Sequence, residues 1–152
     1  MDLPRVNMNI ISQAEDAGIN RVNIINCVDD ETKVELSQST SIAGEAAFLA
    51  LEAAVTDLKR GAVDVLLTAP INKHNIQNDE FHFPGHTEYL EERFGGVGRK
   101  ALMILMKDGL RVALVPGHIP LAEVPSRITV EVIVSKLGIL NQWLRQVFGI
   151  VM

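Results

Sequence analysis

Several features that would define a specialised protein are rare or missing in this sequence. Cys27 is its one cysteine, so an internal disulfide is impossible, and we expect the reducing cytoplasm as its compartment. No apolar run approaches the roughly 18 residues needed to cross a bilayer, and the N-terminus lacks the pattern of a signal peptide. The net charge of −5 argues against nucleic acid, because phosphate binding calls for clustered lysine and arginine. We therefore expect neither a membrane nor a nucleic-acid partner.

Aromatic residues and familiar catalytic motifs are also scarce. Only 5% of the residues are aromatic, so aliphatic side chains and alanine are expected to fill the core. No GxxxxGKS or GxxxxGKT loop, HExxH pair, GxSxG elbow or CxxC pair occurs, so the phosphate, zinc and hydrolase sites built on those motifs are not expected. With 152 residues, 47% of them hydrophobic and 22% charged, the composition is that of one globular domain.

The first half of the chain has the pattern of a β-α-β unit. Residues 21–28 (RVNIINCV) are rich in β-branched residues and predict a short strand, in which Cys27 is expected to be buried. Residues 39–61 predict a helix that one of the polar residues 39–41 can cap. Residues 62–70 (AVDVLLTAP) are a continuous apolar run, typical of a strand covered on both faces. A helix between two such strands indicates a parallel sheet.

The second half predicts a hairpin and a helix. Residues 100–106 and 110–116 are strand-like and are separated by the turn signal KDG. Residues 129–149 have apolar positions at helical spacing, with Thr129 as a possible cap. The predicted fold class is α/β, with a mixed, mostly parallel sheet flanked by helices. Both ends of the chain look like the interior of something longer, so we expect residues 1–152 to be a single α/β fragment of a larger enzyme.

One candidate ligand site follows the apolar run. Ligands of open α/β sheets bind beyond the carboxyl ends of the strands. There TAPINKHN offers the Thr68 hydroxyl, the Asn72 amide and the Lys73 cation, and a helix starting near Asn72 would add free N–H groups that suit an anion. The competing interpretation is a plain turn with Asn72 as its cap.

Two histidines have comparable positions. His118 lies in LVPGHIPL, after a predicted strand, and can be a metal ligand or a surface residue that only hydrogen-bonds. His86 and Thr87 follow a Pro-Gly turn at the start of a predicted helix, where Thr87 can cap the helix and His86 can donate to a ligand. The competing interpretation makes His86 merely exposed. His74 and His82 are expected to be surface residues.

Three stretches that occur in order carry a family resemblance: LLTAPINKHNI (66–76), FPGHTEYLEERFG (83–95) and LRVALVPGHIPLAEVPSRIT (110–129). Together they resemble the 4-hydroxythreonine-4-phosphate dehydrogenases of bacterial vitamin B6 biosynthesis, and the likeness covers most of the chain from about Val22 onward.

The resemblance implies the reaction and the cofactors. Members of the family oxidise the secondary alcohol of 4-phosphohydroxy-L-threonine with NAD or NADP, and the β-keto acid then loses CO2 to give 3-amino-2-oxopropyl phosphate. The implied fold is similar to the isocitrate and isopropylmalate dehydrogenases, with two domains and a homodimer. A divalent metal (zinc, magnesium or cobalt), held by three histidines from both subunits, is implied to act as a Lewis acid.

The resemblance also implies site residues. His86 and Thr87 match the substrate-binding pair, His118 matches the first metal histidine, and Lys73 lies in a turn that could meet the substrate. It identifies no catalytic or cofactor-binding residue in this sequence. Pro116 and Gly117 stand where threonines are common in the family.

Family members are about twice as long as this chain, and the other metal and substrate ligands lie beyond it. A metal site needs a complete coordination shell, so the chain by itself is expected to be inactive. Two alternatives stay open: a sister dehydrogenase for a four-carbon sugar-acid phosphate of the threonate or erythronate type, and a non-catalytic module for dimerisation or ligand binding.

Overall fold

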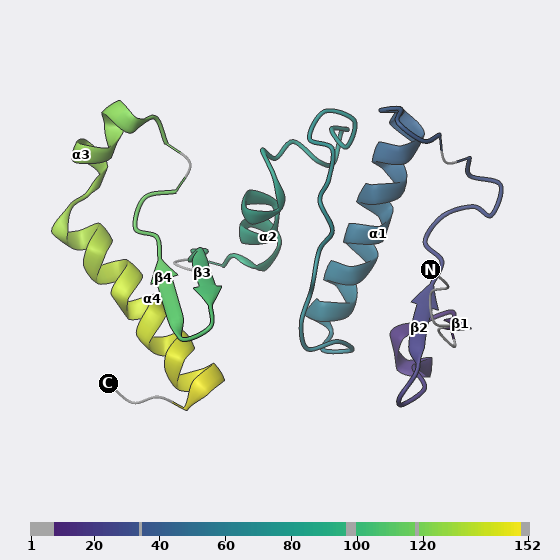
Figure 1. Ribbon diagram of the computed structural model, residues 1–152, viewed down its shortest axis with the longest axis horizontal. Coiled ribbons are helices and arrows are strands. Elements are labelled where there is room, and N and C mark those ends of the chain that lie inside the picture. The colour runs from purple at the N-terminus through teal and green to yellow at the C-terminus, as the bar shows by residue number, and fades with distance from the viewer. Residues whose placement is uncertain (1–7, 34, 97–99, 118, 150–152) are drawn as a thin grey trace. The chain divides into compact units, whose positions relative to one another are not determined.

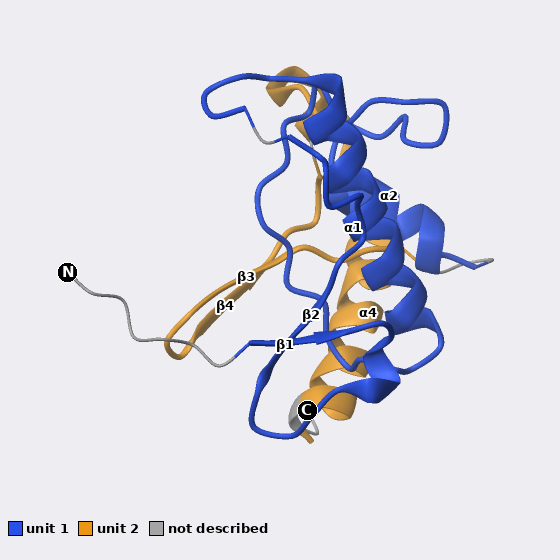
Figure 2. Cartoon of the chain, turned by 90° about the vertical axis from the view of Figure 1, so that its right-hand side faces the viewer, with its two compact units in different colours: residues 1–99 blue, residues 100–152 orange. Residues whose placement is uncertain are grey.

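The computed structural model describes residues 8–33, 35–96, 100–117 and 119–149 of the chain (Figure 1). The chain divides into two compact units, residues 1–99 and residues 100–152 (Figure 2). Within the described ranges no helix is long and apolar enough to cross a membrane.

Unit 1 begins with a small parallel sheet. Strands β1 (Met8–Ile11) and β2 (Val22–Ile25) pair in parallel register, and the short helix η1 (Ala14–Asp16) lies in the connection between them. The side chains of Asn9 and Asn23 bond across the pair at 3.0 Å, and Asn23 also bonds both backbone groups of Gly18. These hydrogen bonds of the asparagine side chains fix the register of a strand pair that is too short to be held by its backbone hydrogen bonds alone.

The strand prediction for residues 21–28 is confirmed at its centre and wrong at its end. Strand β2 stops at Ile25, so Cys27 lies beyond it and is half-buried, with its Sγ 3.7 Å from the Ile25 carbonyl oxygen. Strand β1 was not predicted, because four residues that include an asparagine give too short a pattern to recognise.

Helix α1 (Ser41–Lys59) confirms the helix prediction, and its cap is Thr40, whose Oγ1 accepts from the Ala43 N–H at 3.2 Å. After the helix the chain turns at Gly61, which has a φ of 74°. The buried positions of α1, namely Gly44, Phe48, Leu51 and Val55, recur at helical spacing along one stripe.

The core of unit 1 forms between that stripe, the segment 76–81 and helix α2 (His86–Phe94). Its six buried hydrophobic residues are Phe48, Leu51, Val55, Ile76, Phe81 and Tyr89. Three of the six are aromatic, and Phe81 lies within 6.2 Å, centroid to centroid, of three other rings. The expectation that aliphatic residues and alanine fill the core is therefore right only in part, because aliphatic residues share the core with a cluster of the few aromatic ones.

The strand predicted for residues 62–70 is absent. The segment has no regular hydrogen bonding, and Val65 and Leu67 are 78% and 94% exposed. A strand needs a neighbour to pair its backbone groups, and no described strand pairs with this segment. The predicted β-α-β unit is consequently not formed, although Leu66 and Ile71 still pack against the core.

Unit 2 is a hairpin and helices. Strands β3 (Ile104–Lys107) and β4 (Leu110–Ala113) pair antiparallel around a two-residue loop, in which Asp108 has a φ of 50°. The helices η2 (Leu121–Glu123) and α3 (Val124–Arg127) lead to α4 (Val130–Phe148). The hairpin and the last helix both confirm their predictions.

Helix α4 has the predicted cap. The Thr129 Oγ1 accepts from the Val132 N–H at 3.3 Å, and Gly149 ends the helix in the left-handed conformation. The α/β class is thus confirmed, but the described strands form two separate two-stranded sheets, one parallel and one antiparallel, instead of one mixed sheet.

Candidate functional site

Residues 72–76 form a single hydrogen-bonded turn in place of the helix expected near Asn72. The Asn72 Oδ1 accepts from the backbone N–H groups of His74 (3.0 Å) and Asn75 (3.4 Å), and the Asn72 Nδ2 donates to the Ser39 Oγ at 2.8 Å. The competing interpretation of this segment, a turn capped by Asn72, is therefore correct. The carbonyl of Asn72 closes the turn by accepting from the Ile76 N–H at 3.2 Å.

This turn rests directly on the start of α1. The Asn75 Nδ2 donates to the Thr40 carbonyl at 2.9 Å. Gly44 is buried against the turn so closely that a Cβ on it would lie 1.8 Å from the Asn75 carbonyl oxygen. Only glycine permits this close contact with the Asn75 backbone, so Gly44 determines how closely the turn packs on the helix.

Gln77 connects the turn to the segment that leads into α2. Its Nε2 lies 3.1 Å from both the Lys73 carbonyl and the Phe83 carbonyl, and donates to each of them. One amide group therefore couples the backbone of Lys73 to the backbone three residues before His86.

Helix α2 begins at His86, directly after Gly85. Gly85 occupies the N-cap position and has no side chain to cap with, so the prediction that Thr87 caps the helix is wrong. Thr87 lies inside the first turn and is half-buried. The N–H groups of such a first turn have no partner within the helix, and the helix dipole makes that end favourable for negative charge.

Lys73 lies beside this helix start. A Cβ placed on Gly85 would lie 3.7 Å from the Lys73 Cε, 3.9 Å from its Nζ and 3.7 Å from the Glu88 Oε2. The fold therefore brings the cation of the TAPINK turn next to the Gly-His-Thr sequence, twelve positions further along the chain.

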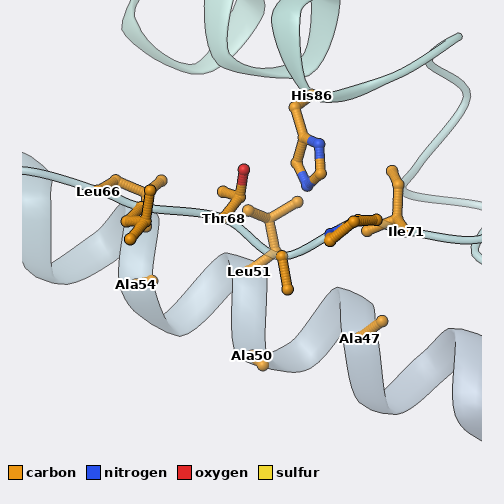
Figure 3. A pocket seen from close by; sticks show the side chains of 11 residues that line it. Ala47, Ala50, Leu51, Ala54, Leu66, Thr68, Ile71 and His86 are labelled. Carbon is orange, nitrogen blue, oxygen red and sulfur yellow. The ribbon is translucent and has the colours of Figure 1, made fainter.

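His86 faces a pocket of about 240 Å³ between α1 and residues 66–71 (Figure 3). Its ring points from the start of α2 toward Thr68 and Leu51. The other lining residues are mostly apolar: Ala47, Ala50, Ala54, Leu66, Leu67, Ala69, Pro70 and Ile71. Thr68 and His86 supply the polar side chains of this pocket, which is the arrangement expected for a small ligand with a few polar groups.

The other histidines considered in the sequence are His118, His74 and His82. His118 lies outside the described residues. His74 and His82 are exposed as predicted, and the His82 Nε2 is 3.0 Å from the Asp79 carbonyl oxygen. No group of three or more His, Cys, Asp or Glu side chains that could hold a metal occurs within the described ranges.

A cluster that the sequence did not suggest lies behind His86. Glu52 of α1 accepts a hydrogen bond from the Tyr89 hydroxyl and an ion-paired one from Arg93, both on α2. Burial, and then the bond to Glu52, raises the pKa of Tyr89 well above its ordinary value. In the sequence, the four-residue spacing of Tyr89 and Arg93 indicates only that the two residues share one face of a helix. It does not identify Glu52 as their hydrogen-bond partner.

Comparison with known proteins gives the family. The family model described as Pyridoxal phosphate biosynthetic protein PdxA matches residues 1–152. The chain belongs to the PdxA family.

Relatives within the PdxA family carry a consistent name. A 4-hydroxythreonine-4-phosphate dehydrogenase of Bacteroides thetaiotaomicron is 53% identical over 146 residues, which is 96% of this chain and 40% of the relative. One of the same name from Sulfurihydrogenibium sp. is 39% identical over 150 residues, 97% of this chain and 45% of the relative. The chain thus spans less than half the length of these relatives.

Solved structures of the PdxA family agree with the fold. The crystal structure of the Klebsiella pneumoniae 4-hydroxythreonine-4-phosphate dehydrogenase matches with a TM-score of 0.80 and 26% identity, over 94% of this chain and 44% of that one. A putative enzyme of the same name from Salmonella typhimurium matches with a TM-score of 0.79 and 25% identity, over 94% and 45%.

Proposed function

We propose that this chain forms part of an NAD- or NADP-dependent dehydrogenase that oxidises 4-phosphohydroxy-L-threonine in pyridoxal phosphate biosynthesis. Bound NAD or NADP would supply the acceptor for the hydride of the secondary alcohol, and the resulting β-keto acid would lose CO2. The observation that carries the proposal is the family match over residues 1–152. It is supported by His86 and Thr68 in one pocket and by Lys73 beside Gly85 at the start of α2. We place the enzyme in the cytoplasm, as a homodimer.

Within this reaction the described residues would bind and orient the substrate. The Lys73 ammonium beside the start of α2 suits the negative charge of a phosphorylated substrate, because a cation and a helix N-terminus both favour anions. The His86 ring, which faces the pocket, and Thr87 in the same helical turn would hydrogen-bond the polar groups of the substrate. The apolar wall made by α1 would exclude water from its carbon chain.

The metal and the nicotinamide cofactor rest on the family resemblance alone. We propose His118 as one ligand of a divalent metal, but the described residues contain no set of three ligands and do not fit such a site by themselves. The described residues include no glycine-rich phosphate loop for a dinucleotide either. We propose that the 152 residues alone do not turn over substrate.

A pair of histidine variants tests the substrate role. In the protein at its natural length, we expect His86→Asn to raise KM for 4-phosphohydroxy-L-threonine by at least tenfold, because a group that orients the substrate is lost. His82→Asn is the matched control: His82 lies four residues away and is exposed. Equal kinetics of the two variants would contradict the proposal.

The substrate and the oligomer need separate measurements. Initial rates with 4-phosphohydroxy-L-threonine, threonate 4-phosphate and erythronate 4-phosphate, each with NAD and with NADP, decide among the sister activities. If no turnover is detected with any of these substrates, a non-catalytic module is favoured. Sedimentation of the 152-residue chain over a range of concentrations tests the homodimer, and a monomer throughout would contradict self-association by this part.

A further inference from the structure

A carboxylate on α1 is bound at both oxygens by residues of α2. The Tyr89 hydroxyl donates to the Glu52 Oε1, and the Arg93 Nη2 donates to the Glu52 Oε2. A single bond would allow α2 to pivot around it. Two bonds from positions four residues apart hold α2 against both sliding and rotation about its axis.

The same face of α2 carries His86. His86, Tyr89 and Arg93 stand at positions i, i+3 and i+7 of the helix, so their side chains project in nearly the same direction. Glu52 also follows Leu51, which lines the His86 pocket, directly along α1. The rotation of α2 that satisfies Glu52 is therefore the rotation that points His86 toward Thr68.

The apolar contacts of α2 are less directional than these bonds. Tyr89 is 1% exposed and packs on Phe81 and Phe83, with ring centroids 5.2 and 5.5 Å away. Such packing keeps the helix docked, and hydrophobic contact has little preference for one exact rotation. Loss of the carboxylate would thus leave α2 in place with a looser orientation.

Arg93 depends on the same carboxylate. The Glu52 side chain is 24% exposed and that of Arg93 is 37% exposed. The Arg93 Nε is buried without a hydrogen-bond partner in the part of the chain that the structure describes, so the arginine is held through its Nη2 end. If the Glu52 carboxylate were removed, the partly buried Arg93 guanidinium would lose the ion pair that fixes its position.

We propose that Glu52 is a positioning residue: through Tyr89 and Arg93 it sets the rotation of α2 and hence the place of the His86 ring in the pocket. This role rests on the proposed function of His86 as a substrate-binding group. Glu52 itself is not among the residues that line that pocket.

The decisive variant is Glu52→Gln, which keeps the size of the side chain but presents an amide to two donors. We use the natural-length protein labelled with 15N-histidine, and identify the His86 ring signals by their loss in His86→Asn. Without any ligand, Glu52→Gln is expected to shift or broaden the His86 ring signals and to leave those of His74 and His82 unchanged. Glu45→Gln is the matched control, an exposed glutamate on the same helix.

Kinetics give a second measure. Because a misplaced binding group weakens the hold on substrate, Glu52→Gln is expected to raise KM for 4-phosphohydroxy-L-threonine about tenfold with a smaller change in kcat. Tyr89→Phe, which keeps the ring packing and removes one of the two bonds, should give an intermediate shift and an intermediate KM.

The outcomes separate the two proposals. Unchanged His86 ring signals in a folded Glu52→Gln protein would overturn the positioning role, and so would equal effects in Glu45→Gln. If Glu52→Gln does not fold, Tyr89→Phe decides by the same signals. Altered His86 signals together with an unchanged KM in both Glu52→Gln and His86→Asn would support positioning and overturn the substrate role of His86.

Discussion

The carbonyl oxygen of Asn75 lies 1.8 Å from the point that a Cβ on Gly44 would occupy. The turn that carries Lys73 is therefore seated on a helix position that has no side chain. The side chains of Asn72 and Asn75 hold the turn there by bonding to Ser39 and to the Thr40 carbonyl. Gly44, buried in α1, therefore determines the position of the turn that carries Lys73.

Gly44→Ala is expected to destabilise the protein although alanine favours helices. The new methyl group would clash with backbone atoms of Asn75 and Ile76, which cannot rotate away as a side chain can. Overpacking of this kind costs about 1–3 kcal/mol or more, and alanine returns at most about 1 kcal/mol in helix propensity, so we expect a net loss in the free energy of unfolding. Urea titration measures it, and a variant as stable as the parent would show that the turn does not sit on α1.

Gly138→Ala is expected to do the opposite. Gly138 lies inside α4, is exposed, and a Cβ on it would meet nothing within 4 Å in the described structure. The variant should gain up to about 1 kcal/mol, because alanine restricts the unfolded chain and favours the helix. Thermal unfolding followed by circular dichroism checks this, and a loss of stability would mean that this face of α4 is covered.

Alkaline pH is expected to destabilise unit 1 through Tyr89. Burial and the bond to Glu52 raise the pKa of the folded Tyr89 above the ordinary value of 10.0. Above that pH the unfolded tyrosine loses its proton while the folded one keeps it, so high pH favours the unfolded chain. The contribution is complete below pH 10 and is lost as pH rises from there.

Tyr89 is the one tyrosine of the chain, so the near-ultraviolet absorbance of tyrosinate reports this residue alone. We expect the folded protein to titrate at higher pH than the urea-unfolded protein. Tyr89→Phe should lose part of the fall in stability between neutral and alkaline pH. Identical titration curves for the folded and unfolded protein would contradict the raised pKa.

Phe81→Ala is expected to be among the most damaging single changes in unit 1. The ring is fully buried and lies 5.2–6.2 Å, centroid to centroid, from the rings of Phe48, Phe83 and Tyr89. Removal of a buried phenylalanine costs about 3–5 kcal/mol, since the cavity closes only in part. Phe94→Ala, at a half-buried position on the same cluster, is the control and should cost less in the same urea titration.

The elements that could be predicted are those whose signals are local. Thr40 and Thr129 cap their helices as the sequence indicates, and the KDG turn joins an antiparallel hairpin. In each case the residues that determine the structure are only a few positions apart. The order of the three motif stretches likewise placed Lys73 and His86 among the candidate site residues.

What the sequence could not decide depends on partners far along the chain. The apolar run 62–70 has a strand pattern, but pairing needs a neighbouring strand, and the described residues provide none. In the sequence Glu52 is an ordinary helix glutamate, and its role follows only from its hydrogen bonds to Tyr89 and Arg93 of α2. By itself the sequence determined helices α1 and α4 with their caps, the hairpin and the motif residues, because nearest-neighbour geometry and hydrogen bonding suffice for these. Only the tertiary structure decided that the Lys73 turn rests on Gly44 and that Glu52 binds α2, because burial and long-range contacts arise when separate elements meet.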